Sequence, residues 1–416
     1  MGKLKVMVIG GGTGGLCLAH GLRAAGIEVR LFERDRTPTD RQQGYRLTIN
    51  AMGARALQSC LPAGNFERYI VASARISTTV TFLDHKLRRL LVIELPDTDQ
   101  SAPHAPRPIS RTALRRVLLD GLQEVVAFGK TFVSFETAPA GRITARFEDG
   151  SSAEGDVLVG ADGASSRVRG QLLPHARRIE TGVISISGKL ALGPDVRGIA
   201  PAAVFKGPTL ILGPRGGVMF AGAVEYPPVR SSDHDQDEYV MWGFSMQQQG
   251  LHVRTPAAEL SGEAARTLVL EQIADWSPDI RHLVERSPAS SVTAFAVKSS
   301  VPIEPWTTSQ VTLLGDALHN MTPYRGIGAN TALRDAALLR DALRDVDAGQ
   351  RELLPALAAY EHEMIDRGFA AVRASLAQMN RIHTRSSLSR LATRTVFRVL
   401  DAAPWLRSRM LDLGAS

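Results

Sequence analysis

The order of apolar and polar positions at the start of the chain predicts a strand, a helix and a second strand. Residues 4–9 are almost continuously apolar, which is typical of a buried strand. Residues 13–25 place apolar side chains at helical spacing, and residues 29–32, Val-Arg-Leu-Phe, predict a second short strand. This alternation indicates a helix that packs on a sheet of parallel strands.

The segments that follow predict a hairpin, a helix and three more strands. A proline-rich stretch at 103–108 separates the hairpin from the helix. The last strand is apolar and ends in a turn at 160–163 that can face a ligand at the carboxyl edge of a parallel sheet. The expected ranges are 75–83 and 87–95 for the hairpin, 111–124 for the helix, and 130–138, 142–148 and 153–160 for the strands.

From about residue 180 the pattern changes to short runs rich in Val, Ile, Phe and Gly. Such runs favour a largely antiparallel sheet. A helix near 262–275 interrupts them, and residues 311–314 return the chain to the first sheet. The runs cover residues 183–192, 203–212, 218–226 and 239–246, and the final helices cover 330–346, 352–374 and a basic tail.

This order predicts an α/β protein with a Rossmann-like domain and an inserted, largely antiparallel β-sheet domain. A cleft between the two layers is the expected ligand site. We expect the Rossmann-like domain to comprise residues 1–74, 105–178 and 302–350, the inserted domain 75–104 and 179–301, and a C-terminal helical segment 351–416.

A glycine-rich turn, residues 10–15, lies between the first strand and the first helix. Glycines let backbone N–H groups approach a pyrophosphate, and the helix that follows presents its positive end. Glu33 ends the second strand, 23 residues after Gly10, where a carboxylate can accept hydrogen bonds from ribose hydroxyls. The combination predicts nucleotide binding, and the alternative is a tight turn without a ligand.

A second glycine-rich turn, residues 315–330, follows roughly 300 residues after the first. Two turns so far apart in the sequence can bind one long cofactor. The first suits a pyrophosphate, and the second suits the redox-active end of the same molecule.

Composition and charge narrow the class of protein. A hydrophobic content of 44% without an apolar run near 18 residues argues against a transmembrane helix, and we expect no secretory signal and a cytoplasmic location. Cys17 and Cys60 have no metal-ligand spacing, so we expect no metal site. Residues 381–416 hold seven Arg and two Asp and so carry most of the net charge of +7, which argues against a track for nucleic acid.

The basic tail has the pattern of an amphipathic helix. We expect its apolar stripe to pack on the body of the protein, and contact with a membrane surface or with a second copy is the alternative. The stripe consists of Leu388, Leu391, Thr395, Val396, Val399 and Leu400, with Arg385, Arg390, Arg394 and Arg398 mostly beside it.

Three motifs in this order resemble the class A, single-component flavoprotein monooxygenases, which have the fold of p-hydroxybenzoate hydroxylase. The resemblance covers residues 4–375 and rests on the turn 10–15, the Asp-Gly segment 157–169 and the Gly-Asp segment 315–330. It implies that FAD is the cofactor. The cofactor-binding residues that it implies are Gly10, Gly12, Thr13, Gly14, Gly15, Glu33, Arg34, Arg111, Asp162, Gly163, Gly315, Asp316, Pro323, Gly326, Gly328, Ala329 and Asn330.

The chain is similar in length to the tetracycline-inactivating and salicylate-type members. In the former, an arginine at the spacing of Arg41 contributes to binding of the nicotinamide cofactor. This sequence departs from the family pattern at Thr48, where those enzymes have an aspartate, and at Leu318, which replaces an alanine. A helix that starts near Gly328 would also direct its positive end at the electron-rich edge of a reduced flavin.

The resemblance implies that NADPH or NADH reduces FAD, that O2 forms a C4a-hydroperoxide, and that oxygen passes to an aromatic or polycyclic small molecule. Secondary metabolism or xenobiotic modification in bacteria is the expected setting, with a monomer or homodimer as the active form. A flavin halogenase, a prenyl reductase of the same fold and a non-catalytic FAD-binding partner are alternatives. No catalytic base is assigned, and the candidate substrate contacts are Arg46, Phe205, Leu212, Phe220, Trp242 and Phe244.

Overall fold

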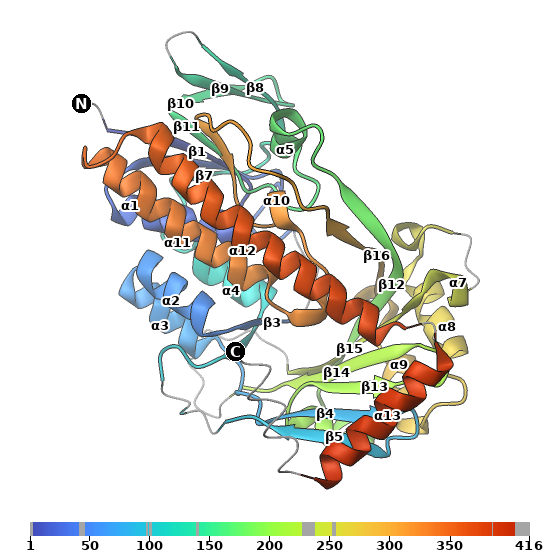
Figure 1. The fold of residues 1–416 in the computed structure, drawn as a ribbon. Coiled ribbons are helices and arrows are strands. Elements are labelled where there is room, and N and C mark those ends of the chain that lie inside the picture. The colour runs from blue at the N-terminus through green and yellow to red at the C-terminus, as the bar shows by residue number, and fades with distance from the viewer. Residues whose placement is uncertain are drawn as a thin grey trace. The chain divides into compact units, whose positions relative to one another are not determined.

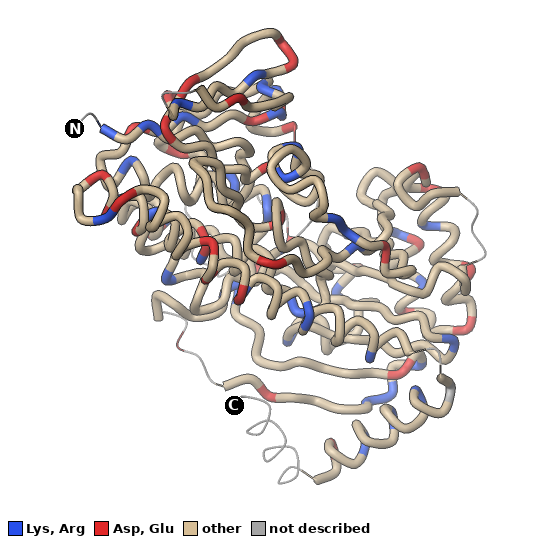
Figure 2. Tube along the Cα trace, turned by 45° about the horizontal axis from the view of Figure 1, so that its top comes forward, with Lys and Arg blue, Asp and Glu red and all other residues tan. Residues whose placement is uncertain are grey.

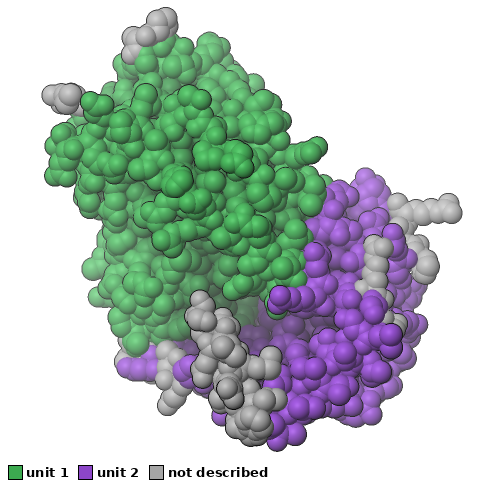
Figure 3. Space-filling model, in the orientation of Figure 1, with its two compact units in different colours: residues 1–73, 101–179, 298–378 green, residues 74–100, 180–297, 379–416 purple. Residues whose placement is uncertain are grey.

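The computed structural model describes residues 3–40, 46–96, 99, 102–138, 141–226, 238–251, 255–384 and 386–403. The chain divides into two compact units (Figure 3). Unit 1 comprises residues 1–73, 101–179 and 298–378, and unit 2 comprises 74–100, 180–297 and 379–416. The expected C-terminal segment 351–416 is therefore not one part, because residues 351–378 belong to unit 1 and 379–416 to unit 2.

Unit 1 is built on a five-stranded parallel sheet with the order β17-β11-β1-β2-β7 (Figure 1). The first strand in the sequence lies at its centre and pairs with β11 on one side and β2 on the other. Its strands are β1 (Lys5–Ile9), β2 (Glu28–Phe32), β7 (Val126–Ala127), β11 (Val157–Gly160) and β17 (Val311–Leu313). The α/β, Rossmann-like architecture that the sequence predicts is confirmed.

Long helices cover this sheet. Helix α1 (Thr13–Ala24) packs against α11 (Gly328–Asp347), and α12 (Leu353–Ile382) runs beside them (Figure 1). The other helices of unit 1 are shorter: α2 (Ala51–Cys60), α3 (Ala63–Val71), α4 (Arg111–Leu119), α5 (Arg167–Leu172), α10 (Asp316–His319) and a 3-10 turn (Pro323–Arg325).

Two small antiparallel sheets complete unit 1. Strand β3 (Arg46–Ile49) pairs with β6 (Arg107–Ser110). A three-stranded sheet joins β8 (Phe132–Thr137), β9 (Ile143–Phe147) and β10 (Ser152–Gly155).

Unit 2 contains a seven-stranded sheet with the order β16-β12-β15-β14-β13-β4-β5, largely antiparallel as the sequence predicts. The pair of β13 with β4 is parallel. The strands are β4 (Thr79–Asp84), β5 (Arg89–Glu94), β12 (Arg178–Ala191), β13 (Thr209–Leu212), β14 (Val218–Val224), β15 (Tyr239–Gln247) and β16 (Thr293–Ser300), of which β12 starts and β16 ends in unit 1.

The helices of unit 2 are mostly short. Helix α8 (Gly262–Gln272) and α9 (Pro278–Glu285) contribute to the same apolar core as the sheet, and α13 (Ser387–Ala402) lies beside β5. The others are α6 (Pro194–Ile199), α7 (Gln248–Leu251) and 3-10 turns at Ala202–Phe205, Ala257–Glu259 and Ala289–Ser291.

Three predicted elements are wrong in part. The strand expected at 153–160 is two strands, β10 and β11, which belong to different sheets. The other two elements differ at a glycine. The strand expected at 203–212 is a 3-10 turn followed by β13, because Gly207 has φ +158° and Pro208 follows it. The helix expected at 111–124 ends at Leu119, before Gly121 with φ +83°. In both places a glycine conformation that other residues rarely adopt interrupts the periodic pattern.

Candidate cofactor site in unit 1

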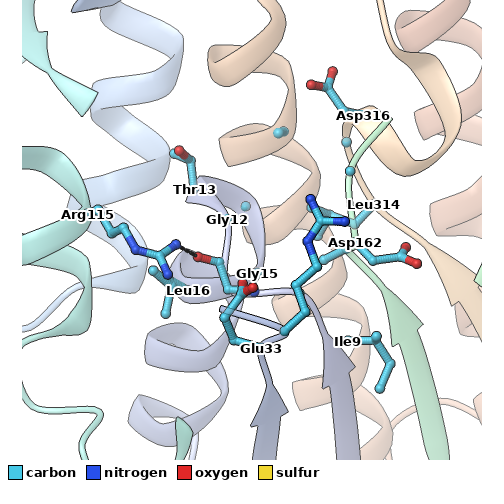
Figure 4. Close-up of a pocket in the computed structure, with 18 of the residues that line it drawn as sticks. Ile9, Gly12, Thr13, Gly15, Leu16, Glu33, Arg115, Asp162, Leu314 and Asp316 are labelled. Carbon is cyan, nitrogen blue, oxygen red and sulfur yellow. Dashed lines mark hydrogen bonds between the residues drawn. The ribbon is translucent and has the colours of Figure 1, made fainter. Parts of the chain in front are cut away.

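The three predicted motifs line one cavity of about 250 Å³ in unit 1 (Figure 4). Arg41 lies outside the described residues, and Pro323, Gly326 and Asn330 are not among the lining residues. The predicted cofactor residues that line the cavity are Gly10, Gly12, Thr13, Gly14, Gly15, Glu33, Arg34, Arg111, Asp162, Gly163, Gly315, Asp316, Gly328 and Ala329.

The first turn brings the start of α1 to the cavity. Gly10 has φ +112°, and its N–H donates to the carbonyl oxygen of Phe32 at 2.8 Å. A side chain on Gly15 would place its Cβ 2.1 Å from the carbonyl oxygen of Gly10, whereas a Cβ on Gly12 would meet no atom within 4 Å. The turn is therefore closed on its inner side and open toward the cavity, where the first N–H groups of α1 can bind an anion.

Glu33 is held by the backbone around this turn. Its side chain is 3% exposed, and its two oxygens accept from the N–H of Gly11 at 2.6 Å and from the N–H of Asp35 at 2.9 Å. An ionised carboxylate has about four acceptor positions, so two remain for other donors. Glu33 can thus accept hydrogen bonds from the hydroxyls of a ribose while it stays fixed in position.

Arg115 on α4 also lines the cavity, and the sequence did not indicate it. Its guanidinium donates to the carbonyl oxygen of Gly11 at 2.6 Å (Figure 4) and to the Asp35 carboxylate at 3.0 Å. The side chains of Arg115 and Asp35 are 11% and 14% exposed, so solvent screens this ion pair less than an exposed one. Arg115 therefore connects the glycine turn to the loop that follows Glu33.

We expect Arg115→Gln to weaken FAD binding about tenfold, because the glycine turn and the loop after Glu33 lose their shared donor. Titration of the apo-protein with FAD, followed by flavin fluorescence, measures the effect. Arg116→Gln is the matched control, because Arg116 is on the same helix and is exposed. Equal affinities of the two variants would contradict this role for Arg115.

The Asp-Gly segment connects the cavity to α5. Asp162 Oδ2 accepts from the N–H groups of Arg167 at 2.8 Å and Val168 at 3.3 Å, whereas its buried Oδ1 has no hydrogen-bond partner in the described protein. Arg169 donates to the carbonyl oxygens of Ala317 at 2.6 Å and Ala164 at 3.1 Å. The segment is thus tied to α10 of the third motif, and Asp162 keeps an acceptor available.

A buried pair of side chains, His319 and Asp335, holds the Gly-Asp motif in position. Asp335 Oδ2 on α11 accepts from the N–H of Gly315 at 3.1 Å and from His319 Nε2 at 2.7 Å. Asp316, which lies between Gly315 and His319 in the sequence, is exposed and lines the cavity. Burial by itself would lower the pKa of His319, but the charge and hydrogen bond of Asp335, with a smaller effect of Asp316, raise this pKa above 6.5.

We expect this pair to make stability depend on pH. A histidine with a raised pKa in the folded protein contributes fully below the unfolded value of 6.5, and this contribution is lost as pH rises through the folded-state pKa. The free energy of unfolding in urea at fixed FAD concentration should therefore fall in the wild type as pH rises from 6.5 through the folded-state pKa. In His319→Gln this free energy should fall less over the same pH range. Asp335→Asn should lower the free energy of unfolding by about 3 kcal/mol or more, because it breaks the buried pair with His319. Identical pH slopes for the wild type and His319→Gln would contradict the argument.

Asn330 joins α11 to the segment after β3. Its Nδ2 donates to the carbonyl oxygen of Thr48 at 2.9 Å, and its Oδ1 accepts from the N–H of Asn50 at 2.9 Å. A Cβ on Gly53 would lie 2.3 Å from Asn330 Oδ1, so this approach requires the glycine. The bonds assign Asn330 to positioning the start of α11, beside Gly328 and Ala329 of the cavity wall.

The candidate substrate residues differ in their environments. Trp242 and Phe244 are 0% and 1% exposed within the apolar core of unit 2, and Trp242 Nε1 donates to Ser287 Oγ at 2.8 Å. This burial favours a structural role for both. The other candidates are Phe205, Leu212 and Phe220 of unit 2 and Arg46 on β3 of unit 1, and all four are half-buried.

The cavity fits a dinucleotide with a flavin end. It combines an open anion-binding helix start at Gly12, a fixed carboxylate at Glu33 and an exposed carboxylate at Asp316. Within the described ranges, no group of three or more His, Cys, Asp or Glu side chains could hold a metal ion.

A family model described as FAD binding domain matches residues 3–375. The chain belongs to this FAD-binding family. The resemblance to single-component flavoprotein monooxygenases is confirmed, and FAD is the cofactor. All three predicted motifs thus lie within the residues that the family model matches.

Similar proteins are described as monooxygenases. The dual O-methyltransferase/FAD-dependent monooxygenase of Phaeosphaeria nodorum is 30% identical over 89% of this chain and 45% of its own length. The aurachin C monooxygenase/isomerase of Stigmatella aurantiaca is 30% identical over 88% of this chain and 86% of its own. A crystal structure from Photorhabdus luminescens, described as a candidate FAD containing monooxygenase, superposes with a TM-score of 0.82 at 36% identity, over 91% of this chain and 98% of that one. The chain spans less than half of the length of the first of these relatives.

Proposed function

We propose that this protein is an FAD-dependent monooxygenase that uses NADPH or NADH and O2 to hydroxylate or epoxidise an aromatic or polycyclic small molecule. The observation that carries the proposal is the convergence of all three flavoprotein motifs on one cavity in a chain of this family. The relatives named above support the reaction class, since their names describe monooxygenases.

The first and third motifs have distinct parts in this proposal. The N–H groups at Gly12 and Thr13 bind the pyrophosphate, Glu33 accepts from the adenosine ribose, and Asp316 accepts from the ribityl hydroxyls. The start of α11 at Gly328 provides a partial positive charge for the electron-rich edge of the reduced ring. FAD, when bound, supplies electron transfer from the nicotinamide and the activation of O2.

Substrate contacts are proposed for Arg46, Phe205, Leu212 and Phe220. These four side chains are half-buried and retain some exposure. Aromatic or polycyclic groups of a substrate would match the three apolar side chains of unit 2.

The test is oxygen incorporation. Purified protein loaded with FAD is supplied with NADPH or NADH, 18O2 and a panel of phenolic and polycyclic compounds, and products are analysed by mass spectrometry. We expect at least one compound to stimulate nicotinamide oxidation and to gain one 18O atom. Nicotinamide oxidation that yields only hydrogen peroxide with every compound, or an FAD that no electron donor reduces, would contradict the proposal.

A further inference from the structure

Helix α13 of unit 2 is attached to its sheet by one side. The rings of Phe397 and Phe82 pack with centroids 4.7 Å apart, and Arg394 donates to the carbonyl oxygen of Leu212 at 2.7 Å. At the C-terminal end of the helix, Asp401 accepts from Arg89 at 2.8 Å. These contacts fix which side of α13 faces the protein.

The apolar stripe expected to pack on the body lies mostly on the opposite side. Leu388 is 80% exposed, Leu391 62%, Val396 48% and Val399 50%, whereas Leu400 is buried. The described residues include nine exposed large hydrophobic side chains, and four of them are on this one helix. The expectation from the sequence is therefore wrong for these four positions. Exposed apolar side chains that cluster in this way mark an interaction surface.

The charges around this surface are mainly positive (Figure 2). Arg390, Arg394 and Arg398 are on α13, whose one acid, Asp401, is paired with Arg89. Burial lowers the pKa of Arg394, Asp84 opposes this, and the nearby charges of Arg390, Arg398 and Arg88 lower it further. The helix thus combines an exposed apolar stripe with a net positive charge, of which Arg398 is exposed and Arg390 and Arg394 are half-buried.

We propose that this face of α13 binds the surface of an anionic membrane. Leucine and valine side chains would enter the boundary between headgroups and acyl chains, the exposed Arg398 would contact lipid phosphates, and the positive charge of the half-buried Arg390 and Arg394 would add attraction at longer range. None of the helices in the described part of the chain is long and apolar enough to cross a bilayer, so the contact is with the surface. The proposal does not depend on the proposed enzymatic function.

A second copy of the chain fits this surface less well. Paired copies of α13 would bring Arg390 and Arg398 of one copy close to the same basic residues of the other. The helix has 16 residues and is therefore about 24 Å long and 10 Å wide, so a pair buries roughly 500 Å². A stable interface usually buries about 1,200 Å² or more.

Co-sedimentation of the FAD-loaded, full-length protein with lipid vesicles tests the proposal. We expect binding to vesicles of phosphatidylcholine mixed with phosphatidylglycerol, weaker binding to phosphatidylcholine alone, and loss of binding at high salt. Leu388→Gln combined with Leu391→Gln should lower the partition coefficient about tenfold or more, because two apolar insertions are removed. Leu354→Gln is the matched control and should bind as the wild type does, because Leu354 is a 47% exposed leucine on another helix, α12.

Three results would overturn the proposal. The first is no binding to anionic vesicles, and the second is equal binding by the double variant and the wild type. The third is a dimer in analytical ultracentrifugation that the double variant dissociates, because a second copy would then occupy the surface. Unfolding in urea verifies that the double variant is folded, and its substitutions lie at exposed positions where stability should change by less than about 0.5 kcal/mol.

Discussion

Asp316→Ala should release most of the bound FAD. The side chain is exposed in the cavity and follows Gly315, whose N–H is fixed by Asp335. Hydrogen bonds to a charged group contribute about 1.5–3 kcal/mol, so the affinity for FAD should fall roughly 10- to 100-fold. The flavin absorbance that remains after gel filtration, and titration of the apo-protein with FAD, measure the loss.

The control for this change is Asp366→Ala on α12. Asp366 is also an exposed acid of unit 1, and it pairs with His362 at 3.4 Å on the surface, a contact that contributes little to stability. The control should keep its yellow colour and its affinity for FAD. If Asp316→Ala also retains FAD with unchanged affinity, the ribityl role of Asp316 is wrong.

Gly12→Ala should weaken FAD binding without lowering stability, whereas Gly15→Ala should lower stability. A Cβ on Gly12 meets nothing within 4 Å, and Gly12 has φ −78°, which alanine adopts easily, so the apo-protein should be as stable as the wild type. The new methyl group lies where backbone must approach the pyrophosphate, and FAD affinity should fall at least about tenfold. At Gly15 the Cβ would lie 2.1 Å from a backbone oxygen, and unfolding should require about 3 kcal/mol less free energy.

The two variants are measured by urea unfolding of the apo-protein and by fluorescence titration with FAD. Gly12→Ala separates binding from folding, and Gly15→Ala is its internal comparison. A Gly12→Ala protein that binds FAD normally would place the pyrophosphate elsewhere. A Gly15→Ala protein with full stability would show that the turn tolerates the side chain.

The sequence predicted the parts of the fold that local patterns determine. Strands β1, β11 and β17 are short, largely apolar runs. The turn 10–15 and the segment 315–330 follow β1 and β17, and Asp162 and Gly163 of the second motif follow β11. Helices α2 and α3 were missed, because they are short and Pro62 separates them. Strand β7 has only two residues and offers no period to detect.

Tertiary contacts explain the residues that sequence reasoning missed or misplaced. Arg115 joins Gly11 to Asp35 only because α4 folds next to both, and no local spacing reveals that proximity. Trp242 and Phe244 alternate along β15 as substrate-facing residues would, but alternation does not show which face of a sheet is covered by helices. The stripe of α13 has a clear period, yet the period does not show which side of the helix faces solvent.

The position of β17 at the edge of the parallel sheet has a consequence for biosynthesis. Its partner β11 emerges from the ribosome about 150 residues earlier, and until β17 and α11 are made the site lacks Gly315, Asp316 and Gly328. At translation rates of about 5–20 residues per second, the nascent chain waits roughly 8–30 s with the β11 edge unpaired. Such a high contact order predicts slow maturation, and flavin capture should come after synthesis is nearly complete. Chaperone supply and growth temperature should therefore affect the yield of yellow protein.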